Sequence, residues 1–205
     1  MAAGFKKATV RAADVPSTQT DFPSYVDLDR IGVTTLAEAQ SIRVYADEAK
    51  TVEWAREIVS ATEMHVKVPS LTSTVDIYVD WDGVRSDYAV GATYGRNAVW
   101  VDYEFVSHDG GGTDSTGNHS TTAEGGVTSG GITGKIGVGT SYDGSNDGFD
   151  TGYDSFNPRN NFTMSVWTRV IDIQAPGWII GKGEVLSNYF GIINRTDRGL
   201  VIQSR

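Results

Sequence analysis

Apolar and polar residues alternate along much of the chain, with the two-residue period that is typical of a β-strand. The clearest example is Val75–Trp81, in which Asp76, Tyr78 and Asp80 separate four apolar residues. The same period predicts strands over residues 5–10, 22–28, 41–46, 52–59 and 64–68. Pro69 is expected to end the last of these because proline has no N–H to donate. Short strands at spacings of about ten residues favour a β-sandwich.

A helical signal occurs once in this part of the chain. Thr35 is followed by Glu38 at the spacing of a capping box, so a short helical turn is predicted over residues 35–40. Asp82-Gly83 predicts a turn after the strand that ends at Trp81. Residues 84–98 are expected to form a connector.

The following part is rich in glycine and begins with a dense aromatic run, Val99–Val106, which predicts extended backbone. Residues 107–133 have loop composition, but a structureless loop of this length is unusual in a compact domain, so a short strand is expected within them. β character returns over residues 134–149, and further strands are predicted at 162–171, 178–181, 189–193 and 200–202.

The pattern as a whole predicts an all-β protein of two antiparallel β-sandwich modules. The N-terminal β-sandwich domain is assigned to residues 1–95 and the second domain to residues 96–205. The last predicted strand lies at the end of the chain. The second domain is therefore expected to be incomplete, to be completed by strands of a neighbouring chain, or to be small.

Composition narrows the classes of partner. The formal net charge is −9, and a protein that neutralises phosphates needs a basic surface, so no nucleic-acid partner is expected. There is no cysteine, which excludes disulfides and thiolate metal sites. No run approaches the ~20 apolar residues of a membrane span, and no signal-peptide pattern is visible, so membrane insertion is not expected.

Four segments of the first domain share a pattern with a known family. They are Ser41–Tyr45, the glutamate-containing Val52–Ile58, His65–Pro69 and Val75–Val79. Together they resemble a bacterial and phage β-domain of unknown function that commonly precedes a laminin-G/concanavalin-A-like module. The chain departs from the usual pattern at three places: Ser41 replaces Asp, Met64-His65 replaces Val-Trp, and Asp80-Trp81-Asp82-Gly83 replaces Tyr-Tyr-Gly.

A second set of segments covers the start of the predicted second domain. It comprises Val99-Trp100, Tyr103, Val106, His108, Asp114–Asn118, Gly134–Gly137, Tyr142–Asp147 and Phe162–Trp167. In this order the segments resemble the opening of a laminin-G/concanavalin-A-like jelly roll, and the resemblance implies that the chain holds only part of that module. Asp114 and Asn118 are expected to form turns by bonding nearby backbone amides, and Gly134 and Gly137 to permit positive φ or close strand approach.

One group of residues is a candidate metal site. Asp143, Asn146, Asp147 and Asp150 offer four oxygen-bearing side chains within eight residues. Laminin-G-like domains often hold a calcium ion, so the resemblance implies Ca²⁺ as the candidate cofactor, with these residues as its ligands. The alternative is a polar turn without metal, and no other cofactor is expected.

Tryptophans and histidines are the other candidate site residues. Trp81, Trp100 and Trp178 are candidates for stacking on sugar rings, although buried aromatic side chains are the commoner case. His65 is expected on the surface of a strand, and His108 is expected to be structural. The histidines lack the spacing of a zinc site.

Catalysis has little support in the sequence. Glycosidases of the concanavalin-like fold commonly carry Glu-x-Asp-x-x-Glu on one strand, and this pattern is absent. Asp76 and Asp80 share a strand face, but a separation of about 13 Å is too long for a retaining pair. Gly130–Ile136 differs from a phosphate loop because Ile136 stands where Ser or Thr binds Mg²⁺. No enzymatic activity is expected.

These observations favour a non-enzymatic virion protein of a tailed bacteriophage, as a tail, fibre or capsid-decoration component. The family resemblance is frequent among phage structural proteins. The expected partners are other virion proteins, copies of the same chain in a homo-oligomer and, as a candidate ligand, cell-surface glycan. The expected location is the virion, after synthesis in the host cytoplasm. The alternatives are a bacterial cell-surface lectin or adhesin fragment and, third, a polysaccharide hydrolase.

Overall fold

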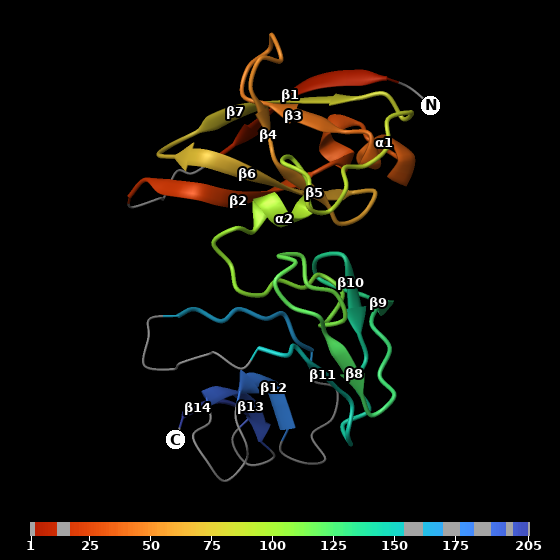
Figure 1. The fold of residues 1–205 in the computed structure, drawn as a ribbon, viewed down its shortest axis with the longest axis vertical. Coiled ribbons are helices and arrows are strands. Elements are labelled where there is room, and N and C mark those ends of the chain that lie inside the picture. The colour runs from red at the N-terminus through yellow and green to blue at the C-terminus, as the bar shows by residue number, and fades with distance from the viewer. Residues whose placement is uncertain are drawn as a thin grey trace.

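The computed structural model describes residues 3–11, 17–153, 162–169, 177–182, 190–195 and 199–204. These residues form short antiparallel strands and little helix, so the prediction of an all-β protein is confirmed at that level. No helix in these ranges is long and apolar enough to cross a membrane. Figure 1 shows two bodies, one with strands β1 to β7 and the other with strands β8 to β14. The division at residues 95 and 96 stays a prediction.

Two antiparallel sheets form the first body, which we call the N-terminal unit (the described residues between 3 and 99). Sheet A has the strand order β1-β7-β3-β4, and sheet B has the order β2-β6-β5. The strands are β1 (Gly4–Val10), β2 (Gln19–Asp27), β3 (Arg43–Tyr45), β4 (Glu53–Trp54), β5 (Arg56–Ile58), β6 (Glu63–Leu71) and β7 (Val75–Trp81). The unit also holds a 3₁₀ turn, η1 (Asp29–Ile31), and the helices α1 (Leu36–Gln40) and α2 (Arg96–Val99).

The hydrophobic core of this unit takes side chains from both sheets. Ile77, Val79 and Trp81 of β7 lie in one buried cluster with Val26 of β2 and Met64 of β6. The polar residues between them on β7 are less buried, so the alternation predicted for this strand is confirmed. Because burial removes apolar surface from water, this cluster is the main source of stability for the unit.

The strand predicted over residues 52–59 is in fact two strands. β4 pairs with β3 in sheet A, whereas β5 pairs with β6 in sheet B. Ala55 lies between them and is buried where the chain passes from one sheet to the other. The hydrophobic period alone cannot show this change of sheet, because β4 and β5 are each too short to have a separate pattern of apolar residues.

Pro69 does not end β6, which continues to Leu71. β5 pairs with β6 only over residues 64–66, so the ladder on that side does not need the N–H that proline lacks. On the other side, Asp21 stands opposite Pro69 without pairing and has a φ of +49°. The prediction was wrong because a proline is tolerated where the strand edge is locally free.

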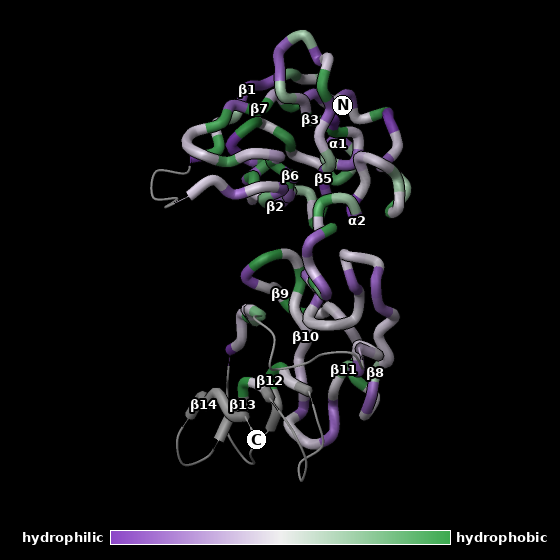
Figure 2. The backbone as a smooth tube through the Cα atoms, turned by 60° about the vertical axis from the view of Figure 1, so that its left-hand side comes forward, coloured by the Kyte–Doolittle hydropathy of each residue, from purple (hydrophilic) through white to green (hydrophobic). Residues whose placement is uncertain are grey.

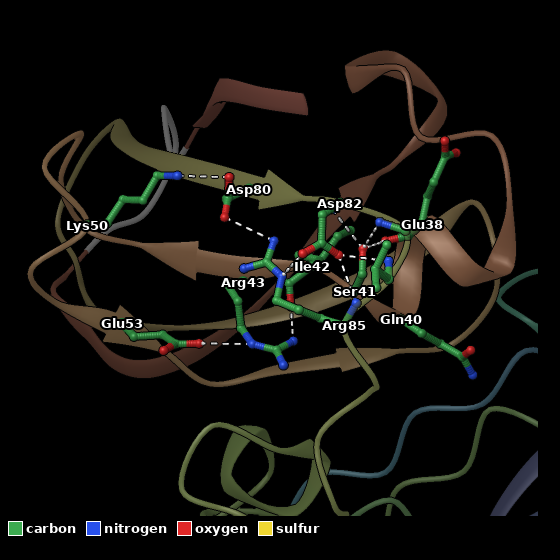
Figure 3. Close-up of polar contacts among 12 residues, drawn as sticks. Glu38, Gln40, Ser41, Ile42, Arg43, Lys50, Glu53, Asp80, Asp82 and Arg85 are labelled. Atoms are coloured by element: carbon green, nitrogen blue, oxygen red, sulfur yellow. Dashed lines mark hydrogen bonds and ion pairs between the residues drawn. The ribbon is translucent and has the colours of Figure 1, made fainter. Parts of the chain in front are cut away.

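Polar contacts at the corner between α1 and β3 connect the helix to the end of β7 (Figure 3). The predicted capping box is confirmed, since Thr35 Oγ1 accepts from the Glu38 N–H and the Glu38 carboxylate accepts from the Thr35 N–H, each at 3.2 Å. The buried Ser41 donates to the Glu38 carbonyl at 2.7 Å. Its Oγ also accepts the N–H groups of Asp82 and Gly83, at 3.1 and 2.8 Å. The turn predicted at Asp82-Gly83 is thereby fixed to the helix end.

The strands described beyond residue 100 form small separate sheets. The pairs are β8 (Thr122–Glu124) with β11 (Gly148–Asp150) and β9 (Gly131–Thr133) with β10 (Val138–Thr140). A three-stranded sheet contains β12 (Gly177–Lys182), β13 (Phe190–Arg195) and β14 (Gly199–Ser204). The short strand expected within residues 107–133 is therefore present as β8, and the three strands predicted near the end of the chain are present as β12 to β14.

Two predictions in this part of the chain were wrong. Val99 ends α2, and residues 100–106 contain no strand, because Trp100 packs against the N-terminal unit. Residues 162–169 contain no strand either, although their apolar side chains alternate; residues 170 and 171 of that prediction lie outside the described part. A strand needs a partner for its backbone groups, and no described strand pairs with this segment.

Hydrophobic residues are unequally distributed between the two bodies. In Figure 2 the strands of the N-terminal unit carry much of the hydrophobic colouring, and the loops around β8 and β10 are mostly white and purple. Beyond residue 100, Val127 is the one buried hydrophobic side chain among those whose burial the structure describes. The described loops of the second body are therefore held mainly by polar contacts.

Replacing Ser41 with alanine is expected to lower the free energy of unfolding by about 1–3 kcal/mol, because two buried backbone N–H groups lose their acceptor. Urea denaturation of the purified chain measures this change. Ser60→Ala is the control, since the Ser60 hydroxyl contacts only Thr62 near the surface. An equal loss in both variants would contradict the role assigned to Ser41.

Candidate functional site at the junction between the two bodies

Glu57 and His65 lie side by side on the outer face of sheet B. They are register partners on β5 and β6, and the residues before and after His65 belong to the core, so both side chains face away from it. Such a face usually meets water. Here residues that follow α2 cover it, and the exposed fractions of Glu57 and His65 are only 4% and 6%.

The Glu57 carboxylate receives three hydrogen bonds from the covering segment. Trp100 Nε1 donates to Oε2 at 2.6 Å, and Ser115 Oγ donates to Oε1 at 2.6 Å. His108 Nε2 lies 3.1 Å from Oε2. A buried charge is costly unless hydrogen bonds replace its water, and these three donors supply that replacement.

Glu57 is ionised at neutral pH in this setting. Burial by itself would raise its pKa, but the hydrogen bonds from His108, Ser115 and Trp100 outweigh burial and hold the pKa below the ordinary value. An ionised carboxylate only accepts hydrogen bonds, so the Nε2 of His108 must carry a hydrogen. The negative charge of Glu57 therefore keeps a hydrogen on the His108 nitrogen that faces it.

His65 is buried, and the prediction of a surface position was wrong. Its ring stacks on His108 with centroids 5.0 Å apart and lies 5.1 Å from the ring of Trp100, while Tyr25 packs edge-on at 5.9 Å. Neither ring nitrogen of His65 has a hydrogen-bond partner among the described residues. Burial, aided by the neighbouring His108, lowers the pKa of His65 to about 4. The ring is therefore neutral at pH 7.

A small apolar cluster lies beside the carboxylate. Ala55, Val99 and Trp100 are buried in it, and Ala98 and Val106 pack against them. α2 packs on both β5 and β6, which brings Val99 and Trp100 onto sheet B. The cluster keeps water away from the bond between Trp100 and Glu57, and a hydrogen bond is stronger where the local dielectric is low.

Asp114 organises the loop that carries Ser115. Its carboxylate oxygens accept the backbone N–H groups of Val106, Thr116, Asn118 and His119, at 3.0 to 3.1 Å. Burial would raise the pKa of Asp114, but the hydrogen bonds from the Thr116 hydroxyl and these amides keep it below the ordinary value. The predicted turn role of Asp114 is confirmed. Asn118 differs from the prediction, because its side-chain amide donates to the Tyr103 carbonyl at 3.2 Å.

Gly137 makes a second contact with the N-terminal unit. Its φ is +61°, and a Cβ at this position would lie 2.7 Å from Val59 and 2.8 Å from the His108 carbonyl oxygen. The N–H of Gly137 donates to the carboxylate of Glu63. A Cβ at Gly134 would lie 2.9 Å from the backbone of Val138. The positive φ or close approach expected at these two glycines is confirmed. At Gly137 the close approach places the turn between β9 and β10 against sheet B.

The arrangement of Ser115, Glu57 and His108 is not that of a serine triad. In a triad the hydroxyl bonds to the histidine and the histidine bonds to the carboxylate. Here both the hydroxyl and the imidazole bond to the carboxylate, whose lowered pKa makes it a weak base. A cavity of about 200 Å³ adjoins these three residues and is also lined by Arg96 and Asp109. The geometry suits attachment of one segment to another.

The four predicted calcium ligands lie in a polar turn. Asp143 Oδ1 accepts the Ser145 N–H at 2.8 Å, and Asp147 Oδ2 accepts the Asp143 N–H at 2.9 Å. Asp150 Oδ1 accepts the Gly152 N–H at 2.8 Å. In the part of the chain that the structure describes, no group of three or more His, Asp or Glu side chains is arranged to hold a metal ion. Calcium binding here stays a prediction.

Two of the three tryptophans proposed for sugar stacking are buried. Trp81 and Trp100 each have an exposed fraction of 5%. β1 covers Trp81, and a Cβ at Gly4 would lie 2.2 Å from its ring. Trp100 donates to Glu57 beneath the second body. As placed, neither ring is available to a sugar, which corrects the prediction for both; Trp178 lies in β12, but its side chain is outside the described part.

Sequence reasoning missed Glu57, the central residue of this site. A single charged residue on a short strand is the ordinary pattern of a solvent-facing position. Its partners Trp100 and Ser115 lie 43 and 58 residues further along the chain. Local spacing therefore contains no signal that would have found the cluster.

Comparisons with protein-family models, with curated proteins and with solved structures each gave no match. The site is accordingly interpreted from its own geometry.

Acidification is expected to destabilise the junction. The pKa of His65 is about 4 in the folded chain and 6.5 in an unfolded one, so the unfolded chain binds more protons between these values. The free energy of unfolding should fall by roughly 3 kcal/mol as the pH drops through this window. Protonation of Glu57, whose folded pKa is lowered, removes a further contribution below about pH 4.5.

Thermal and urea unfolding across a pH series test this expectation. His65→Phe keeps an aromatic ring in the stack but removes the titration, so its stability should depend less on pH between 4 and 6.5 than that of the unmodified chain. The difference between the two profiles separates the effect of His65 from that of the other ionisable side chains nearby, such as Glu57. Parallel profiles would contradict the assignment.

Replacing Glu57 with glutamine is expected to loosen the second body from the first. In glutamine an –NH₂ group, which cannot accept a hydrogen bond, replaces one of the two carboxylate oxygens. Both oxygens of Glu57 accept from Trp100, His108 or Ser115, so at least one of these donors would lose its acceptor. The expected loss is at least about 2 kcal/mol. Small-angle scattering should show a larger radius of gyration, and limited proteolysis should cut faster within residues 100–120. Glu48→Gln, at an exposed site, should change neither.

Proposed function

We propose that the chain is a non-enzymatic structural or attachment protein of a tailed bacteriophage virion, as part of a tail, a fibre or a capsid decoration. The observation that carries the proposal is the buried Glu57 carboxylate, whose three hydrogen bonds tie two β-rich bodies together. A protein that presents one domain on another needs such a fixed connection. The Glu57 carboxylate is engaged by Trp100, His108 and Ser115, which supports a structural role over a catalytic one.

The finer fold is part of the same proposal. We propose that the N-terminal unit is an antiparallel β-sandwich, because both of its sheets contribute to one core. Residues 96–205 are proposed to be part of a laminin-G/concanavalin-A-like jelly roll. The segments from Val99 to Trp167 that resemble this module support the assignment, and tandem β-modules of this kind are frequent in phage structural proteins.

Free strand edges support assembly with further chains. Within the described part, β12 and β14 each pair on one side only, as do β1 and β4 of sheet A. An unpaired edge presents backbone N–H and C=O groups that a strand of another chain can accept. The proposed partners are therefore copies of the same chain and other virion proteins. Many identical contacts would add avidity to weak individual ones.

Antibodies raised against the purified chain are expected to label virus particles from the source culture. Immunogold electron microscopy locates the label, and mass spectrometry of gradient-purified particles should find the chain in several copies per particle. Serum depleted with the recombinant chain is the control.

Two other results would overturn the proposal. Recovery of the chain only as a free cytoplasmic monomer would contradict a virion role. Gold on the cell envelope without labelled particles would instead favour the surface-adhesin alternative. Particle-free fractions from the same gradient distinguish the two.

A further inference from the structure

The outer face of sheet A carries three aromatic side chains among charged ones such as Lys7 and Asp80. Phe5 of β1 stacks on Tyr78 of β7 with ring centroids 6.1 Å apart, and Tyr45 of β3 is the register partner of Tyr78. Residues alternating with these, such as Val44 and Val79, belong to the core, so the three rings face away from it. Phe5 keeps an exposed fraction of 37%. We call Phe5, Tyr45 and Tyr78 the aromatic face.

A hollow of about 450 Å³ lies at one end of the aromatic face. It is lined by Phe5 together with three charged residues, Asp80, Asp82 and Arg85, and by Ala3, Gly4 and the largely buried Trp81. Pockets that combine an aromatic wall with a few convergent polar groups are typical of small-molecule sites. The hollow is the larger of the two cavities described here, and it lies on the face that the second body leaves uncovered.

The charged groups beside the hollow hold one another in place (Figure 3). Arg85 forms ion pairs with Asp80 at 3.0 Å and with Asp82 at 2.8 Å, and Lys50 donates to the other oxygen of Asp80 at 2.8 Å. The Lys50 ammonium also lies 4.5 Å from the centre of the Phe5 ring. The Asp80 oxygens and the two terminal guanidinium nitrogens of Arg85 keep hydrogen-bonding capacity beyond these contacts. The network is thus pre-organised to bond vicinal hydroxyl groups.

We propose that the aromatic face and its hollow bind a neutral glycan built of β-linked hexopyranose units. The flat C–H face of such a ring packs on an aromatic side chain, and its equatorial hydroxyls suit the carboxylate and guanidinium groups of Asp80 and Arg85. A net charge of −9 disfavours acidic polysaccharides and nucleic acids at long range. The inference depends on sheet A alone and stands whether or not the chain is part of a virion.

The competing explanation is that these side chains only cover the sheet. The Lys7–Asp76 pair and the stacking of Phe5 on Tyr78 do tie β1 to β7. A covering role, however, does not require a hollow beside the exposed phenylalanine. The two explanations differ in their outcome, because only a binding site loses affinity for sugar when the fold is kept.

Soluble β-linked probes test the proposal directly. Cellohexaose and chitohexaose are titrated into the full chain and followed by calorimetry and by NMR shifts of backbone amides. At least one probe is expected to bind, with shifts concentrated in β1, β7 and residues 82–85. Phe5→Ala is expected to weaken binding by about tenfold or more, and Asp80→Asn by a similar factor.

Phe22→Ala is the matched control. Phe22 lies on β2 in sheet B with an exposed fraction of 38%, nearly that of Phe5, so its removal should leave affinity unchanged. Phe5→Trp keeps an aromatic ring and should retain binding, which separates loss of stacking from loss of folding. Failure of both probes to bind, or an equal loss in the Phe22 variant, would overturn the proposal.

Discussion

A single buried carboxylate determines how the two parts of this chain are joined. Glu57 is on the outer face of a sheet, where water would normally solvate it, and instead accepts hydrogen bonds from Trp100, His108 and Ser115. Covering such a charge without supplying hydrogen bonds would cost several kcal/mol, so the segment can cover this face only where its donors reach the carboxylate. The charge thereby sets the location of the residues that follow α2.

The position of Glu57 depends in turn on the way β4 and β5 are divided. Had residues 53–58 formed one strand of sheet A, the carboxylate would not be the register partner of His65. The passage at Ala55 transfers the chain to sheet B and turns Glu57 toward the second body. The two sheets consequently have different environments: sheet B is covered over Glu57 and His65, while Phe5 on the outer side of sheet A stays open to solvent.

Much of the N-terminal unit could be predicted because its signals are local. The two-residue period of β7 and the capping box at Thr35 involve neighbours in sequence, and both are present as expected. The continuation of β6 through Pro69 could not be predicted, since it depends on how far β5 extends beside it. The same reason applies to residues 162–169, whose alternation has no described partner strand. A two-residue alternation shows that a segment can form a strand, but the segment becomes a strand only where another strand pairs with it.

The candidate site was beyond sequence reasoning for a related reason. His65 and Glu57 each have the pattern of a surface residue, and only the return of a distant loop buries them. The glycine-rich segments, by contrast, show local turn signals, because the positive φ of Gly137 and the turn at Asp114 depend on neighbouring residues.

Polar tethers take the place of a large core in the described loops of the second body. Val127 is its one buried hydrophobic side chain among those described, whereas Asp114 alone accepts four backbone N–H groups. Hydrogen bonds contribute little net free energy each, so a region held this way is stable only while its geometry is maintained. That geometry is imposed from outside, through Glu57 at Ser115 and Glu63 at Gly137. The order of these loops therefore depends on sheet B as much as on their own contacts.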